Sequence, residues 1–174
     1  MPSDTRQPLL SEMSRRAKLR LLLKHAPPRA TVLEVGPGSS WFARQLRQRG
    51  FRVTTIDLAG DADIVGDVND WERLGIRPHS FDVVIALEVI EHVDCLGALR
   101  TICNHGGLIL LSSPHPRFDW VMQLLEAAHL TQKRTSPHVN LIDFATIDLP
   151  AIVRRRPLRI HQVALFRNTR SPTG

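Results

Sequence analysis

The sequence predicts an α/β fold, a Rossmann-like three-layer sandwich built around a mostly parallel sheet. Three observations support this prediction. Short apolar, β-branched segments alternate with segments of helical spacing, the pattern of βαβ units with right-handed crossovers. Two of the apolar segments, "VVIAL" and "LILL", are continuous enough for strands buried on both faces. Glycines and acidic residues follow several of these segments, at the carboxyl ends of the predicted strands.

An N-terminal helix precedes the alternating pattern. Residues 12–26, "EMSRRAKLRLLLKHA", place apolar side chains at helical spacing among basic ones, and Pro27 and Pro28 end this helix. Strands are then predicted over residues 30–36, 51–59, 62–68, 80–90, 107–113 and 157–166. Helical segments are predicted over residues 41–50, 71–76, 91–105 and 118–130, the third of them ended by Gly106 and Gly107.

The length and composition fit one domain. The chain has 174 residues, of which 43% are hydrophobic, enough for a sizeable core. We expect this domain at residues 13–168, between disordered tails at 1–12 and 169–174. Cys95 and Cys103 do not make a disulfide framework, which favours a reducing, cytoplasmic location. No apolar run approaches the ~18 residues of a transmembrane segment.

Charge is unevenly distributed over the chain, which carries a net charge of +6 with basic ends and an acidic middle. A basic end can contact nucleic acid or an anionic membrane surface, or can be a solvated surface. The segment "RRRP" at residues 154–157 is interpreted as a solvated helix end, with phosphate binding as the alternative. With no Tyr, six Phe and three Trp, stacking platforms for nucleic acid are scarce, so this partner is not favoured.

Several polar residues and glycines predict a nucleoside site, because open α/β sheets bind ligands beyond the carboxyl ends of their strands. Gly36 and Gly38 follow the first strand, and glycine lets the backbone approach a ligand where a Cβ would clash. Asp57 ends the second strand, and a carboxylate about 20 residues after a glycine turn can accept hydrogen bonds from both ribose hydroxyls. After the third strand, Asp67 can accept from an adenine amino group and the Val68 backbone can meet the ring edge.

A family resemblance identifies the nucleoside. The segments "VLEVGPGSSWFARQLRQRGFRVTTIDLA", "DIVGDV", "HSFDVVIALEVIEHV" and "GGLILLSSP" resemble the class I S-adenosylmethionine-dependent methyltransferases. They are most similar to the branch of the ubiquinone-biosynthesis O-methyltransferases and methyltransferase types 11 and 23. The resemblance covers residues 31–114, and "SFDVVIALEVIEHV" is its most specific part. It implies S-adenosyl-L-methionine as the cofactor and methyl transfer as the reaction.

The resemblance also assigns roles around the site. The glycine loop would wrap the amino-acid portion of the cofactor, and Glu34 would position that loop and the methionine amino group. Further residues would hold the ribose and the adenine or border the sulfonium. The implied cofactor-binding residues are Glu34, Gly36, Pro37, Gly38, Asp57, Leu58, Asp67, Val68, Leu87 and Glu88.

The chain departs from the family pattern in three places. Ser40 stands where the third glycine is usual, and we expect a serine to be tolerated because close helix packing matters there more than a positive φ. Residues 157–166 supply one strand where the family has a helix and an antiparallel hairpin, so a shortened C-terminal strand region is expected. The segment after the fifth strand is short, so the cap over the substrate is small or comes from a partner.

Candidate catalytic residues lie beyond the fourth and fifth strands. If "EVIEH" is helical, Glu88, Glu91 and His92 share one face. The resemblance implies that such residues can hold a divalent ion; the alternative is that they brace the next helix. No metal site is assigned, because three ligands from one turn seldom suffice. His115 could be a general base or a loop residue, and His138 could contact substrate or cap a helix.

The expected acceptor is a small molecule or a lipid or cell-envelope precursor. The fourth strand ends "ALEV", without the Asn-Pro-Pro-aromatic tetrad of amino-directed methyltransferases, which favours O- or C-methylation. We expect a monomer or a homodimer. The alternative function is a nucleic-acid-binding or non-catalytic scaffold protein on the same fold, because a fold alone does not prove a function.

Overall fold

The structure is a computed structural model that describes residues 9–114, 142–157 and 161–169. The predicted helix at 118–130 lies outside these ranges. Within them, no helix has the length and apolar character needed to cross a membrane.

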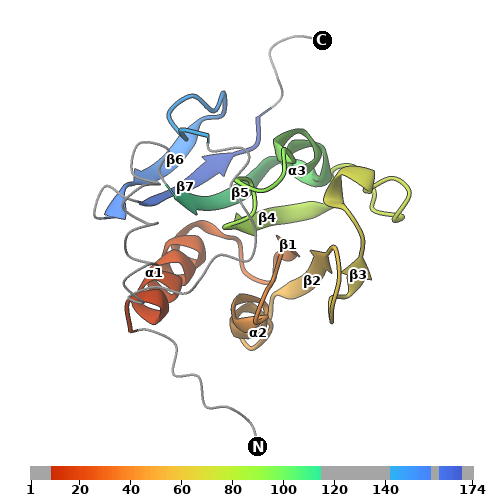
Figure 1. Cartoon of the computed structure of the whole chain (residues 1–174), viewed down its shortest axis with the longest axis horizontal. Helices are drawn as coiled ribbons and strands as arrows, with labels where there is room; N and C mark the ends of the chain where they lie inside the picture. The colour runs from red at the N-terminus through yellow and green to blue at the C-terminus, as the bar shows by residue number, and fades with distance from the viewer. Residues whose placement is uncertain (1–8, 115–141, 158–160, 170–174) are drawn as a thin grey trace, which may run out of the picture.

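In the described part of the chain, seven strands form one sheet in the order β3-β2-β1-β4-β5-β7-β6 (Figure 1). The strands are β1 (Thr31–Val35), β2 (Arg52–Asp57), β3 (Ile64–Val65), β4 (Phe81–Leu87), β5 (Cys103–Pro114), β6 (Ala151–Arg155) and β7 (His161–Arg167). β1 to β5 pair in parallel, β7 runs antiparallel to β5, and β6 runs antiparallel to β7. The strand order reverses at β1 and β4, where such sheets bind ligands.

Helices cover both faces of the sheet and complete three layers (Figure 1). α1 (Leu9–His25) and α2 (Trp41–Arg47) pack on one face, and α3 (Leu96–Ile102) packs on the other. Each face of the sheet has its own hydrophobic core, and alternate residues of β4 are fully buried in one or the other. Val83 and Ile85 face the core under α1 and α2, and Val84 and Ala86 face the core under α3. The predicted α/β, Rossmann-like class with a mostly parallel sheet is confirmed.

The predicted helix over residues 91–105 is wrong at both ends. Residues 91–95 form a turn followed by irregular chain, and the helix occupies only Leu96–Ile102. The glycines at 106 and 107 do not end it; they lie inside β5, where the strand bulges between Cys103, paired with Phe81, and Leu108, paired with Val83. Gly106 adopts φ +76° and its N–H donates to the Asn168 carbonyl at 2.7 Å. A β-bulge uses glycine for the same backbone freedom as a helix end, so the sequence signal was ambiguous.

The two ends of the chain also differ from expectation. α1 begins at Leu9, so residues 9–12 are helical rather than part of a tail. The C-terminal part of the sheet has two antiparallel strands, β7 and β6, whereas the sequence predicted only one. Arg154 and Arg155 lie in β6 and not at a helix end, and the Arg154 guanidinium carbon lies 5.6 Å from the centre of the Phe166 ring. Charged residues are typical of an edge strand, where they oppose further strand pairing.

Candidate functional site

The glycine loop after β1 has a backbone that only glycine adopts easily. Gly36 has φ +63° and its N–H donates to the Ile56 carbonyl at 2.9 Å. A Cβ on Gly36 would lie 2.7 Å from Val89 Cγ2, whereas a Cβ on Gly38, at φ +50°, would meet no atom of the described residues within 4 Å. Packing therefore requires the first glycine. The second leaves the loop open on the side from which a ligand can approach its backbone.

Ser40 corrects one expectation about this loop. It has φ +53°, in the left-handed region, and makes no side-chain cap to α2. Its N–H donates to the Pro37 carbonyl at 2.8 Å, closing the turn, and its own carbonyl accepts from Arg44 N–H at 3.0 Å. The position does require a positive φ, which costs a non-glycine residue roughly 1 kcal/mol or more.

Glu34 lies on β1, two residues before the loop, and is 3% exposed. Burial raises its pKa to about 7, against a hydrogen bond from Ala43 N–H and the charges of Arg47 and Arg15. Its Oε2 atom is buried and has no hydrogen-bond partner among the described residues. A buried, unpartnered carboxyl oxygen beside an open glycine loop fits the ammonium group expected of the cofactor.

Asp57 and Asp67 lie at the same edge of the sheet as the loop. Asp57 ends β2 and is half-buried, and one of its oxygens accepts from the N–H of Leu58, itself 70% exposed. Asp67 caps the short 3-10 helix η1 (Val68–Asp70) by accepting from Asn69 N–H at 2.9 Å. Each carboxylate has a second oxygen for which no bond to the described residues is recorded. The Val68 side chain is buried in the hydrophobic core on the α3 side of the sheet.

A second group of polar side chains meets at Glu88, directly after Leu87 at the end of β4. Lys18 Nζ lies 2.9 Å from Glu88 Oε1 and 2.9 Å from Ser112 Oγ. The Ser112 hydroxyl donates to Glu88 Oε1 at 2.5 Å, and His161 Nε2 lies 2.8 Å from Glu88 Oε2. We call these four residues the Glu88 cluster.

The Glu88 cluster is held by strong electrostatic interactions. Desolvation by burial acts to raise the pKa of Glu88, but the charges of Lys18 and His161 and the hydrogen bonds outweigh it, so the pKa lies well below the usual range. Glu88 itself has φ +58°, an uncommon conformation for a residue with a side chain. Such strained, charge-rich positions are often functional.

Sequence reasoning identified Glu88 but missed Lys18, Ser112 and His161 as its partners. The partners come from α1, β5 and β7, which lie 70, 24 and 73 residues away along the chain. One local signal existed for Lys18, which stands directly beside Leu19 and near Leu22 on the apolar side of α1. Its side chain is 8% exposed, which is rare for lysine without a partner.

The structure does not bring Glu91 and His92 together with Glu88 on one helical face, because this stretch is a turn. Glu91 is 1% exposed and His92 is exposed. Burial and then the nearby charge of Glu88 raise the pKa of Glu91 to about 8, which keeps it protonated at neutral pH. Among the described residues, no group of three or more His, Cys, Asp or Glu could hold a metal ion, and Glu88 already binds an ammonium group.

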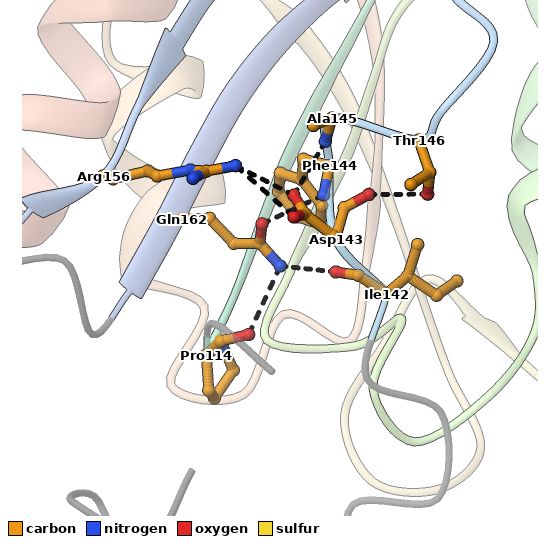
Figure 2. Close-up of polar contacts among 8 residues, drawn as sticks. All are labelled: Pro114, Ile142, Asp143, Phe144, Ala145, Thr146, Arg156 and Gln162. Carbon is orange, nitrogen blue, oxygen red and sulfur yellow. Dashed lines mark hydrogen bonds and ion pairs between the residues drawn. The ribbon is translucent and has the colours of Figure 1, made fainter. Parts of the chain in front are cut away.

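His115 and His138 lie outside the described residues. Residues 114 and 142, where the description stops and resumes, are both held by the side chain of Gln162 (Figure 2). This side chain is 1% exposed. Its amide nitrogen donates to the carbonyls of Ile142 at 2.5 Å and Pro114 at 3.3 Å, and its oxygen accepts from Phe144 N–H at 3.0 Å. One buried amide therefore joins the end of β5 to the segment that begins at residue 142.

Comparisons with known proteins agree with this architecture and identify the family. The methyltransferase domain family matches residues 7–148, so the chain belongs to this family. A ubiquinone biosynthesis O-methyltransferase from Idiomarina loihiensis is 29% identical over 133 residues, which are 64% of this chain and 55% of that protein. One from Xanthomonas campestris is 31% identical over 106 residues, 51% of this chain and 44% of that protein. The chain thus spans about half the length of these relatives.

Solved structures share the fold at low sequence identity. A SAM-dependent methyltransferase from Archaeoglobus fulgidus has a TM-score of 0.58 and 15% identity, covering 90% of this chain and 93% of that one. The 1,6-didemethyltoxoflavin-N1-methyltransferase of Burkholderia thailandensis, solved with S-adenosylhomocysteine and 1,6-didemethyltoxoflavin, has a TM-score of 0.56 and 17% identity, covering 92% and 80%.

Proposed function

We propose that this chain is an S-adenosylmethionine-dependent methyltransferase. The observation that carries the proposal is the open glycine loop beside Glu34, whose buried Oε2 has no partner among the described residues. Asp57 and Asp67 add two carboxylates at the neighbouring strand ends. Membership of the methyltransferase domain family supports the same function.

The residues of this edge would divide the cofactor between them. Gly36, Pro37 and Gly38 would wrap its amino-acid portion, and Glu34 would accept a hydrogen bond from its ammonium group. Asp57 would accept from the ribose hydroxyls, with Leu58 beside the sugar. When bound, the cofactor supplies a methyl group on a sulfonium.

The adenine and the reacting end would lie on either side of the ribose site. Asp67 would accept from the adenine amino group while Val68 lies against the ring edge. Leu87 and Glu88 would border the sulfonium, at the end of the strand next to β1. The protein's main task is to align acceptor, methyl and sulfur and to exclude water.

The proposed acceptor is a small molecule or a lipid or cell-envelope precursor, methylated on oxygen or carbon. The curated relatives that carry the name ubiquinone biosynthesis O-methyltransferase support this direction without naming the acceptor of this chain. Glu91, His92, His115 and His138 remain candidate catalytic residues. Of these, Glu91 is buried and protonated at neutral pH, so it can donate a hydrogen bond or a proton but is not available as a base.

Calorimetric titration of S-adenosylmethionine and S-adenosylhomocysteine into the purified protein tests the proposal. We expect binding by the wild type and an affinity roughly 100-fold lower for Asp57→Ala, because two charge-assisted hydrogen bonds are lost. Asp61→Ala is the matched control, since Asp61 is an exposed carboxylate four residues away. Absence of heat from the wild type at millimolar cofactor would reject the proposed function.

A further inference from the structure

The His161 ring lies at the edge of the sheet that the proposed cofactor site shares. Pro114 at the end of β5 pairs with His161, Ser112 pairs with Leu87 of β4, and Ala86 pairs with Val35 just before the glycine loop. β7 is three strands from β1, so the backbone at His161 is roughly 14 Å across the sheet from the backbone of the loop. The His161 ring extends toward the end of β4, where its Nε2 contacts Glu88.

Among the described residues, only one nitrogen of His161 has a hydrogen-bond partner. Nε2 lies 2.8 Å from Glu88 Oε2, while no hydrogen bond of Nδ1 to a described residue is recorded. The side chain is 23% exposed. Because Glu88 is a carboxylate, the favoured neutral tautomer carries its proton on Nε2 and a lone pair on Nδ1.

The charges around the ring favour this arrangement. Lys18 from α1 neutralises Glu88, and the Ser112 hydroxyl also donates to Glu88. Glu91, a further titratable group near this pair, is held protonated at neutral pH and adds no charge. A proton taken up at Nδ1 would create an imidazolium ion directly beside the Glu88 carboxylate, which stabilises it.

We propose that His161 is a catalytic base that removes the proton from a hydroxyl acceptor, with Lys18, Glu88 and Ser112 as positioning residues. The inference rests on the proposed function and narrows its acceptor to a hydroxyl compound. His161 Nδ1 takes the proton as the acceptor O–H bond breaks, and the oxygen electron pair forms the new O–CH3 bond. The S–CH3 bond breaks with its electrons returning to sulfur. The positive charge lost at sulfur reappears on the imidazole.

A purely structural role for the cluster predicts a different result. The Lys18–Glu88 pair also ties α1 to the sheet, and His161 could serve only to complete that tie. His161→Gln separates the two roles, because the Gln amide can still donate to Glu88 but cannot take up a proton. His79→Ala is the control for loss of an imidazole, since His79 precedes β4 at the opposite end of that strand.

The experiment measures S-adenosylhomocysteine formation with catechol, a primary alcohol and aniline as probes, over a range of pH. We expect transfer to a hydroxyl probe, and a kcat lowered 100- to 10,000-fold in His161→Gln with the cofactor affinity unchanged. The rate of the wild type should fall at acidic pH as the imidazole is protonated. In His161→Gln the rate should rise with pH only as the hydroxyl probe itself ionises, because the variant has no base to take up the hydroxyl proton. Added imidazole should restore part of the activity of His161→Gly, and His79→Ala should behave like the wild type.

Several outcomes would overturn the inference while leaving the cofactor site standing. They are an unchanged kcat in His161→Gln, transfer to aniline alone, and no transfer to any hydroxyl probe by a protein that binds the cofactor. A wild-type protein that binds no cofactor in the calorimeter would instead reject the proposed function together with the inference built on it.

Discussion

The two halves of the functional edge are built in different ways. The half over β1, β2 and β3 uses residues 34–68, a single continuous stretch in which glycines, carboxylates and strand ends follow one another. The half over β4, β5 and β7 uses Lys18, Glu88, Ser112 and His161, which come from four separate elements. The first half depends on backbone conformation, and the second on contacts between side chains distant in sequence.

This difference predicts how each half responds to substitution. We call the half over β1, β2 and β3 the cofactor half, after its proposed role. There, a substitution is harmful where it adds a Cβ to a left-handed backbone or removes a carboxylate that would bind the cofactor. We call the half over β4, β5 and β7 the acceptor half. There, a substitution is harmful where it leaves a buried charge or a buried polar atom without its partner. Four tests, ordered from the largest expected effect to the smallest, examine this contrast.

Gln162→Leu should cost the most stability, about 3 kcal/mol, because it leaves the buried N–H of Phe144 and the part-buried carbonyl of Ile142 without their partner. The free energy of unfolding in urea measures this effect. Gln48→Leu, an exposed glutamine at the end of α2, is the control and should change stability by less than about 0.5 kcal/mol. Equal small effects would show that the amide does not anchor the acceptor half.

Lys18→Met should cost about 2 kcal/mol, a value reduced for the partial exposure of Glu88, because the carboxylate loses its cation. The pair contributes stability above the ordinary pKa of 4.5, and this contribution is lost as the pH falls toward the lower pKa of the folded state. The difference between wild type and variant should therefore shrink below that pH. Arg16→Met removes an exposed pair with Glu12 on the same helix and should have almost no effect at any pH.

Gly36→Ala and Gly38→Ala compare two positions of the same loop. Both would place a Cβ on a left-handed backbone, at about 1 kcal/mol each, but only the first would also bring it within 2.7 Å of Val89 Cγ2. We expect Gly36→Ala to be destabilising by about 2 kcal/mol in urea denaturation. Gly38→Ala should mainly weaken cofactor binding in the calorimeter, because the space above it is open. A larger loss of stability in Gly38→Ala than in Gly36→Ala would contradict the packing role of Gly36 and the binding role of Gly38.

Glu91→Gln should have the smallest effect of the set when stabilities are compared near pH 4.5, and it shows at higher pH as a change in the slope of stability against pH. The wild-type carboxyl keeps its proton up to about pH 8 in the folded state but loses it near 4.5 in the unfolded state. Stability is therefore lost as the pH rises through this window, by at most about 1.4 kcal/mol per pH unit. The variant should show a flatter profile in urea denaturation at several pH values. Glu34, whose pKa is raised to about 7, contributes a slope of the same sign in both proteins.

The prediction of local elements succeeded where short-range sequence patterns decide the structure. The apolar runs of β1, β4 and β5 and the helical spacing of α2 are confirmed, because strand burial and helix periodicity repeat within a few residues. Errors occurred where one signal has two meanings. Gly106 can end a helix or form a bulge, and only pairing of β5 with β4 makes it a bulge. Consecutive arginines can lie at a helix end or in an edge strand, and only the pairing of Arg154 and Arg155 with β7 places them in a strand.

The candidate site shows the same division. The sequence by itself predicted the glycine loop, Glu34, Asp57 and Asp67 as candidate site residues, because each lies at or just beyond the end of a strand that the chain signals locally. Only the tertiary structure decided that Ser40 takes a positive φ, that Glu91 and His92 do not share a face with Glu88, and that Lys18 and His161 do contact it. A charged pair between distant segments leaves no local pattern, because its stability depends on the burial that folding creates.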